Sequence, residues 1–113
     1  AADVPGEDAS GATAVYTGLG TLRAPTGDDR PITVVLTVYF PYPAHDSAFE
    51  EELTGKNRAI RRVILEWFAS RTLEEITSAG EKQVKDQLLE EINRLFVLGR
   101  INTLYFGDYL VLE

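Results

Sequence analysis

Two amphipathic helical patterns, separated by the segment Ser70-Arg71-Thr72, dominate the second half of the chain. Apolar residues recur at the helical spacing on both sides of this segment. They are Phe49, Leu53, Ile60, Val63, Ile64, Trp67 and Phe68 before it, and Val84, Leu88, Ile92, Leu95 and Phe96 after it. Gly99 follows the second pattern as a predicted helix stop. One helix must therefore end, and another begin, at Ser70-Arg71-Thr72.

Three Ser/Thr-x-x-Glu capping boxes predict where the helices begin. In such a box the hydroxyl accepts a hydrogen bond from the third helical N–H, and the glutamate accepts one from the N-cap N–H. The boxes are Ser47–Glu50, Thr72–Glu75 and Ser78–Glu81. They predict a first helix from about Ala48, a short helical segment through Ile76, and a last helix after Ser78. Gly55 costs about 1 kcal/mol relative to alanine inside a helix, so we expect a kink there.

Residues 32–40 form the clearest predicted strand, because apolar residues alternate along it. One face carries Ile32, Val34, Leu36, Val38 and Phe40. Pro41 and Pro43 are expected to end this strand. A weaker strand is predicted over 14–23, where Gly18 and Gly20 favour an edge or a bulge, and a turn is predicted over 24–30.

The last predicted strand spans residues 101–112, and Asp108 interrupts its alternation, which predicts a bulge. The interpretation places Leu104, Phe106, Leu110 and Leu112 on one face, and Tyr105, Tyr109 and Val111 on the other. The order of elements predicts an α+β fold with a small, mostly antiparallel sheet. Two amphipathic helices and a short connecting helix would pack on one face of that sheet. Whether the two long strands pair parallel or antiparallel is left open.

The residue inventory argues against several classes of function. Eighteen acidic and eleven basic residues give a net charge of −7, which disfavours nucleic-acid binding. The chain has no cysteine, and its only histidine, His45, is interpreted as a surface residue in a turn. Glu50-Glu51-Glu52 is assigned to the positive end of a helix dipole rather than to a cation site. We therefore predict a non-enzymatic protein without catalytic, cofactor or metal residues.

Tyrosines cluster on or beside the two best strands, and tyrosine is enriched at protein interfaces. The candidate interface residues are Thr37, Tyr39, Tyr42, Arg61, Arg62, Tyr105 and Tyr109. The sheet face expected to carry Thr37, Tyr39, Tyr105 and Tyr109 is the first choice for subunit contact. The alternative is that the tyrosines border the core with their hydroxyls in water, and that Arg61 and Arg62 are a solvated helix face.

Residues 1–13 are small, acidic and poor in large apolar side chains, which predicts a flexible linker or frayed terminus before one domain over 14–113. The chain contains no methionine, even at position 1. We therefore expect a processed or truncated fragment from which an N-terminal membrane anchor or targeting segment has been removed.

A succession of short motifs extends over residues 31–112. It comprises the strand over 32–40, Ser70-Arg71-Thr72, Glu74-Glu75-Ile76, Gly80-Glu81-Lys82, Ile92-Asn93 and Leu104-Tyr105-Phe106-Gly107-Asp108-Tyr109. In this order the motifs resemble the periplasmic domain of the FliL family of flagellar basal-body-associated proteins. Gly107 departs from the family pattern, where threonine is more frequent, and the glycine-bearing stretch 17–30 extends beyond it.

The resemblance implies the periplasmic domain of a single-pass inner-membrane protein, held at the flagellar basal body by an N-terminal helix missing here. It implies a stomatin-like (SPFH) fold and a homo-oligomeric ring around the stator unit of MotA and MotB. The ring would support stator engagement, torque and motility without catalysis or a cofactor. The alternatives are a stomatin-like membrane scaffold with a non-flagellar partner and a periplasmic ligand-binding domain that uses His45 and nearby acids.

Overall fold

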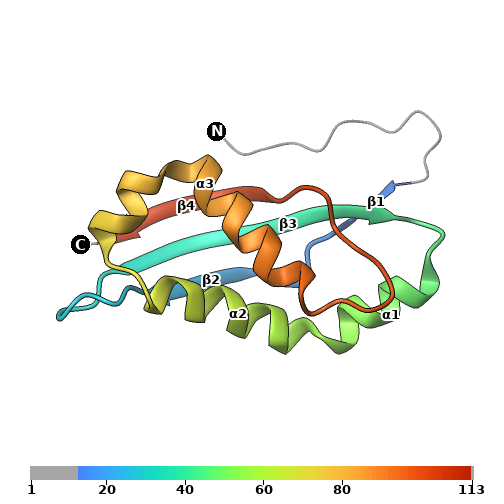
Figure 1. The fold of residues 1–113 in the computed structure, drawn as a ribbon. Helices are drawn as coiled ribbons and strands as arrows, with labels where there is room; N and C mark the ends of the chain where they lie inside the picture. The colour runs from blue at the N-terminus through green and yellow to red at the C-terminus, as the bar shows by residue number, and fades with distance from the viewer. Residues whose placement is uncertain (1–12, 113) are drawn as a thin grey trace.

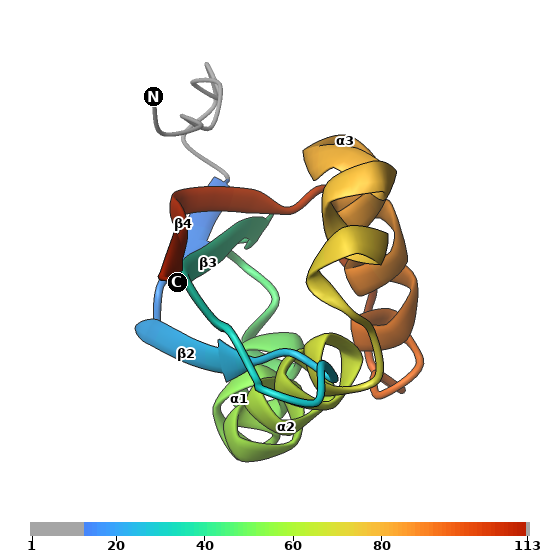
Figure 2. The ribbon, with the colours of Figure 1, turned by 90° about the vertical axis from the view of Figure 1, so that its left-hand side faces the viewer.

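The computed structural model describes residues 13–112, which form a four-stranded sheet with three helices on one of its faces (Figures 1 and 2). The strands are β1 (Thr13–Tyr16), β2 (Thr21–Pro25), β3 (Thr33–Pro43) and β4 (Tyr105–Leu112). The helices are α1 (Ser47–Gly55), α2 (Asn57–Ala69) and α3 (Leu73–Asn93). The predicted α+β class, with its small antiparallel sheet, is confirmed.

The strand β3 is the centre of the sheet, because β1, β2 and β4 all pair with it in antiparallel orientation. The two long strands, β3 and β4, are therefore antiparallel, which the sequence left open. Side chains alternate along β3 as predicted. Val34, Leu36, Val38 and Phe40 are fully buried toward the helices, and Thr33, Val35, Thr37 and Tyr39 are half-buried on the other face.

The predicted end of β3 at Pro41 is wrong, since the strand continues to Pro43. Val15 and Thr13 of β1 pair with these two prolines, whereas pairing with β4 stops at Tyr39. Proline lacks an N–H and is tolerated where a strand has an unpaired edge. The end of β4 leaves such an edge beside Pro41 and Pro43.

The predicted single strand over 14–23 is two strands, β1 and β2, divided by residues 17–20. Gly20 has φ of 65° in this connection, a left-handed conformation that glycine adopts without strain. β2 extends through Pro25, so the following turn begins at Thr26 instead of Ala24. Thr13 belongs to β1 rather than to the predicted linker, and residues 1–12 lie outside the described part of the chain.

The kink expected at Gly55 is a break between two helices, because α1 ends there and α2 begins at Asn57. The N-cap of α1 is Asp46, whose carboxylate accepts a hydrogen bond from the Phe49 N–H at 3.0 Å. The box predicted at Ser47 is therefore wrong by one residue. Aspartate caps a helix as well as serine does. Asp46 precedes Ser47 in the chain, so the helix begins one residue earlier than predicted.

The capping box at Thr72 and Glu75 is confirmed in both directions. The Glu75 N–H donates to the Thr72 hydroxyl at 3.2 Å, and the Thr72 N–H donates to the Glu75 carboxylate at 2.9 Å. The box predicted at Ser78 is wrong, because it requires helical geometry at Gly80. Gly80 has φ of 83° and ψ of 160°, so it forms a kink inside α3. The expected short connecting helix is thus the first part of α3.

The C-terminus of α3 differs from the prediction as well. The helix ends at Asn93, six residues before the predicted stop at Gly99. The Asn93 side chain instead bonds the backbone of Ile101 twice, with its Nδ2 donating to the carbonyl and its Oδ1 accepting from the N–H, both at 2.9 Å. This pair closes a loop over residues 94–100, and β4 begins only at Tyr105.

A bulge at Gly107-Asp108 confirms the predicted interruption of β4. Leu36 pairs with Tyr109 and Val38 pairs with Phe106, so two residues of β4 lie opposite Thr37 alone. One extra residue reverses the alternation beyond it. The predicted faces are therefore wrong after the bulge. Tyr109 and Val111 join Phe106 on the helix side, while Leu110 and Leu112 join Tyr105 on the opposite side.

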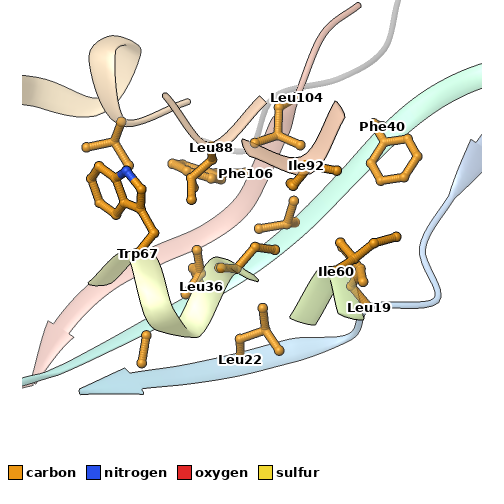
Figure 3. Close-up of a cluster of buried hydrophobic side chains, with 14 of the residues drawn as sticks. Leu19, Leu22, Leu36, Phe40, Ile60, Trp67, Leu88, Ile92, Leu104 and Phe106 are labelled. Carbon is orange, nitrogen blue, oxygen red and sulfur yellow. The ribbon is translucent and has the colours of Figure 1, made fainter. Parts of the chain in front are cut away.

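One apolar core joins the sheet to the helices (Figure 3). Trp67 of α2, which is 5% exposed, extends from α2 toward Leu88 of α3. Its ring meets Phe68 edge-on at 4.9 Å between centroids, and the Arg71 guanidinium lies over it at 4.0 Å. The aromatic side chain is thus part of the core, as the helical spacing predicted.

Candidate interaction surface

The face of the sheet opposite the helices is not covered by any described helix or strand (Figure 2). Side chains that are paired in register point to the same face of a sheet, so the pairings define which residues it carries. We call this surface the open sheet face. It consists of Thr21, Arg23 and Pro25 of β2, Thr33, Val35, Thr37 and Tyr39 of β3, and Tyr105, Asp108, Leu110 and Leu112 of β4.

The open sheet face combines a polar row with two apolar areas. The hydroxyls of Thr21 and Thr37 lie 3.3 Å apart, and Thr37 also donates to Asp108 at 3.4 Å. On one side of this row, the rings of Tyr39 and Tyr105 stack at 5.5 Å. On the other side are Leu110 and Leu112, which are 56% and 48% exposed. Such a mixture of aromatic, aliphatic and hydroxyl groups is typical of surfaces that contact other proteins.

Three predicted interface residues, Thr37, Tyr39 and Tyr105, lie together on the open sheet face. Tyr109 does not, because the bulge turns it toward the helices, where it stacks on Phe106 at 4.9 Å. Burial raises the pKa of the Tyr109 hydroxyl, and the Glu81 carboxylate adds to this effect. The predicted four-residue face is therefore wrong at Tyr109.

Tyr42, Arg61 and Arg62 lie away from this surface. Tyr42 packs edge-on against Phe49 near the start of α1, and burial raises the pKa of its hydroxyl. Arg61 donates to the Leu19 carbonyl at 3.0 Å and so ties α2 to the connection between β1 and β2. Arg62 is exposed on α2. The structure thus does not bring the two arginines to one site with the tyrosines.

Sequence reasoning missed Leu110 and Leu112 as surface residues. Both fit an inward alternation that starts at Leu104, and only the extra residue at the bulge points them outward. The available signal was the Gly107-Asp108 pair, since glycine and aspartate are poor strand formers that often accompany bulges. This pair predicts the bulge, and the prediction places Leu110 and Leu112 on the wrong face because it keeps the plain alternation beyond the bulge.

Sequence reasoning also missed the role of Glu52, which holds the loop over 94–100. Its two carboxylate oxygens accept hydrogen bonds from the N–H groups of Val97 and Leu98, both at 2.9 Å. Lys56 donates to the same carboxylate at 2.9 Å and also to the Leu95 carbonyl. Burial opposes ionisation of Glu52, but these hydrogen bonds outweigh it and hold its pKa below the ordinary value.

The Ser70-Arg71-Thr72 segment is held by the turn after β2. The Gly27 N–H donates to the Arg71 carbonyl at 2.7 Å, and Asp28 accepts from the Leu73 N–H at 2.9 Å. Two hydrogen bonds lower the pKa of the Asp28 carboxylate, with the larger effect from the Thr26 side chain and the smaller from the Leu73 N–H. The break between the helices is thus a docking point for the β2–β3 connection.

Among residues 13–112, no group of three or more histidine, cysteine or acidic side chains could hold a metal ion. Three surface hollows have volumes of about 210, 250 and 470 Å³, and His45 lines none of them. The first two are lined by charged and apolar residues of α2, α3 and the loop before β4, and the third by Ser47, Glu50, Glu51, Thr54 and Gly55 of α1. Small-molecule sites are commonly about 300–1,000 Å³ and mostly apolar. The first two hollows are smaller than such a site, and no large apolar side chain lines the third.

The fold and this surface define a small α+β domain whose most developed feature is a face suited to protein contact. Residues 21–111 match the family described as flagellar basal body-associated protein FliL. The chain therefore belongs to the FliL family. It is 28% identical over 99 residues to the flagellar protein FliL of Treponema pallidum (strain Nichols), covering 87% of this chain. The chain spans about half the length of that relative, 54%.

Proposed function

We propose that this chain is a non-enzymatic domain of the flagellar motor, placed in the periplasm by an N-terminal membrane anchor. Membership of the FliL family carries this proposal, since the family is named for association with the flagellar basal body. Among the described residues, no helix is both long and apolar enough to cross a bilayer. The proposed anchor would therefore precede them.

We propose further that the domain has a stomatin-like arrangement and assembles with copies of itself into a ring around a stator unit of MotA and MotB. In this arrangement it would support stator engagement, torque and motility. The small antiparallel sheet with helices on one face supports this, because the other face remains available for subunits or stator proteins.

The open sheet face is the surface proposed for these contacts. A stable protein interface buries about 800 Å² on each partner and has an apolar or aromatic centre with a polar rim. Tyr39, Tyr105, Leu110 and Leu112 supply apolar and aromatic area on this face, and Arg23 can supply a charged rim. A sheet face is also rigid, so little ordering entropy opposes its association.

The motor assignment is tested by co-purification of the membrane-anchored protein from its host in mild detergent, followed by mass spectrometry. Specific enrichment of MotA and MotB is the expected result. A clean self-oligomer without stator proteins would reject the motor assignment in favour of a stomatin-like scaffold with another partner.

The surface assignment is tested by substituting Tyr105→Glu and Leu110→Glu together in the same protein and measuring assembly by chemical crosslinking and sedimentation. We expect loss of assembly with an unchanged circular dichroism spectrum. Val111→Glu is the control, because Val111 is 42% exposed on the same strand but lies on the helix side, off the open sheet face. Assembly that survives the double substitution would exclude the open sheet face.

A further inference from the structure

Val97 and Leu98 form an apolar tip on the loop between α3 and β4. They are 82% and 57% exposed, and they are the most exposed of the large apolar residues among the described residues. We call these two residues the apolar tip. Exposed single leucines are common on protein surfaces, but two adjacent aliphatic side chains at the end of a loop are a feature that needs a reason.

The loop that carries the apolar tip is held on three sides. Glu52 accepts hydrogen bonds from both backbone N–H groups of the tip, at 2.9 Å each. Phe96 packs edge-on against Phe49 with 5.1 Å between ring centroids. The double hydrogen bond between Asn93 and Ile101 closes the base of the loop. These contacts hold the backbone of the loop in place, and the side chains of Val97 and Leu98 therefore stay exposed.

We propose that the apolar tip inserts into the interfacial region of a lipid bilayer. Its two backbone N–H groups are already bonded to Glu52, so insertion would not leave them without partners, which is a large cost in lipid. The tip alone also presents far less than the roughly 800 Å² that a stable protein interface buries on each partner. A shallow apolar contact with a bilayer needs no shaped acceptor and gains area from each inserted side chain.

Charges near the tip indicate which bilayer it fits. Exposed arginines bracket it at Arg94 and Arg100, but Arg94 is paired with Glu91 at 3.0 Å and with Glu90 at 3.1 Å. The chain as a whole carries a net charge of −7. Attraction to anionic lipid is therefore not the driving force. Binding should be apolar, should occur on zwitterionic phosphatidylcholine, and should persist at high salt, because salt screens only the ionic part.

The position of the tip is consistent with contact at a membrane. The loop, α1 and β1 all lie at one end of the molecule, and the chain enters its described part through β1 (Figure 1). This step rests on the proposed function. An anchor ahead of β1 would hold that end near the bilayer, and a tether raises the effective concentration enough for a weak contact to form.

A site-specific fluorophore tests the proposal. The chain contains no cysteine, so Leu98→Cys and Val111→Cys each take one environment-sensitive label. Val111 is the control, because it is 42% exposed but lies on the helix side of β4, away from both the apolar tip and the open sheet face. On phosphatidylcholine vesicles, we expect emission at position 98 to shift to the blue and rise roughly twofold or more, with protection from iodide. Emission at position 111 should remain unchanged.

Flotation with the same vesicles supplies a second readout. Val97→Ser with Leu98→Ser should abolish binding, while Val111→Ser should not, at both low and high salt. No response at position 98, or an equal response at position 111, overturns the proposal. A response that follows protein concentration without vesicles also overturns it, and assigns the tip to contact between copies. None of these results depends on stator proteins, so failure here leaves the motor assignment to its own test.

Discussion

Gly27 and Ala69 approach so closely that a β-carbon on Gly27 would lie 2.5 Å from the Ala69 carbonyl oxygen. The contact brings the turn after β2 against the end of α2. It positions the Gly27 N–H to donate to the Arg71 carbonyl. A side chain at this position would collide with backbone, which moves less readily than a flexible side chain.

Gly27→Ala should therefore destabilise the domain by about 1–3 kcal/mol, the usual cost of forcing extra volume into a packed contact. Urea unfolding followed by circular dichroism measures this free energy. Gly55→Ala is the control, because a β-carbon at Gly55 meets nothing within 4 Å. It should be neutral or stabilising by up to about 1 kcal/mol. Equal effects at the two glycines would mean that the Gly27 contact is not tight in solution.

Gly107→Ala should be tolerated despite its place in the bulge. A β-carbon there would lie 3.4 Å from Thr37 and Tyr39, which is ordinary van der Waals contact at its near limit. The φ of Gly107 is not in the left-handed region. We expect a change in unfolding free energy within about 1 kcal/mol, because the loss of backbone freedom in the unfolded chain offsets small adjustments. A large loss in urea titration would show that the bulge needs glycine itself.

Trp67→Ala should cost about 3–5 kcal/mol of unfolding free energy, as other large aromatic truncations in packed cores do. Trp67→Phe should cost much less than that. Among the described residues, the indole Nε1 of Trp67 is buried without a hydrogen-bond partner, so its removal abolishes an unpaired polar group along with some packing. Thermal melts of both variants check this order, and a phenylalanine variant as unstable as the alanine variant would contradict it.

Acid should destabilise the domain through three carboxylates. Hydrogen bonds hold the pKa values of the Asp28, Glu52 and Glu75 carboxylates below their ordinary values, at Glu52 against the effect of burial. A carboxyl whose pKa is lower in the folded than in the unfolded chain stabilises the fold at pH values above its unfolded pKa. This stabilisation is lost as the pH falls through the folded pKa. Thermal melts should be flat from neutral pH to about pH 5 and fall below it. Asp28→Asn should reduce that slope, and an unchanged slope would contradict the role assigned to this carboxylate.

The sequence predicted the parts of this fold that depend on local periodicity. The alternation of β3, the stripe of α2 and the box at Thr72 follow from spacing alone, and the structure has them. The predicted stripe of α3 is confirmed as far as Ile92, whereas Leu95 and Phe96 lie past the end of the helix. The errors arise where distant residues decide. Pro41 and Pro43 stay in β3 because β1 pairs with them. The helix α3 ends at Asn93, whose side chain accepts a hydrogen bond from the Ile101 N–H. Such partners lie outside any local window.

The candidate surface was predicted in part for the same reason. Thr37, Tyr39 and Tyr105 were placed correctly because no irregularity separates them from the centre of the sheet. Tyr109 was assigned to the wrong face because the direction of its side chain depends on the extra residue in the bulge before it, and not on the chemistry of tyrosine. Glu52 fitted a helix-dipole interpretation, and its bonds to Val97 and Leu98 join residues more than forty positions apart.

The bulge at Gly107-Asp108 also bears on how this surface could change in evolution. Removal of Gly107 or Asp108 would leave a plain ladder in which every residue beyond it keeps its present partner on β3, but loss of Tyr109 with the bulge retained would exchange the two sets of side chains. Leu110 and Leu112 would then turn toward the helices, and Val111 would turn outward. A single-codon deletion could therefore give a new contact surface without changing any neighbouring amino acid. In this domain, the number of residues in β4 decides which side chains face away from the helices as strongly as the identity of those residues does.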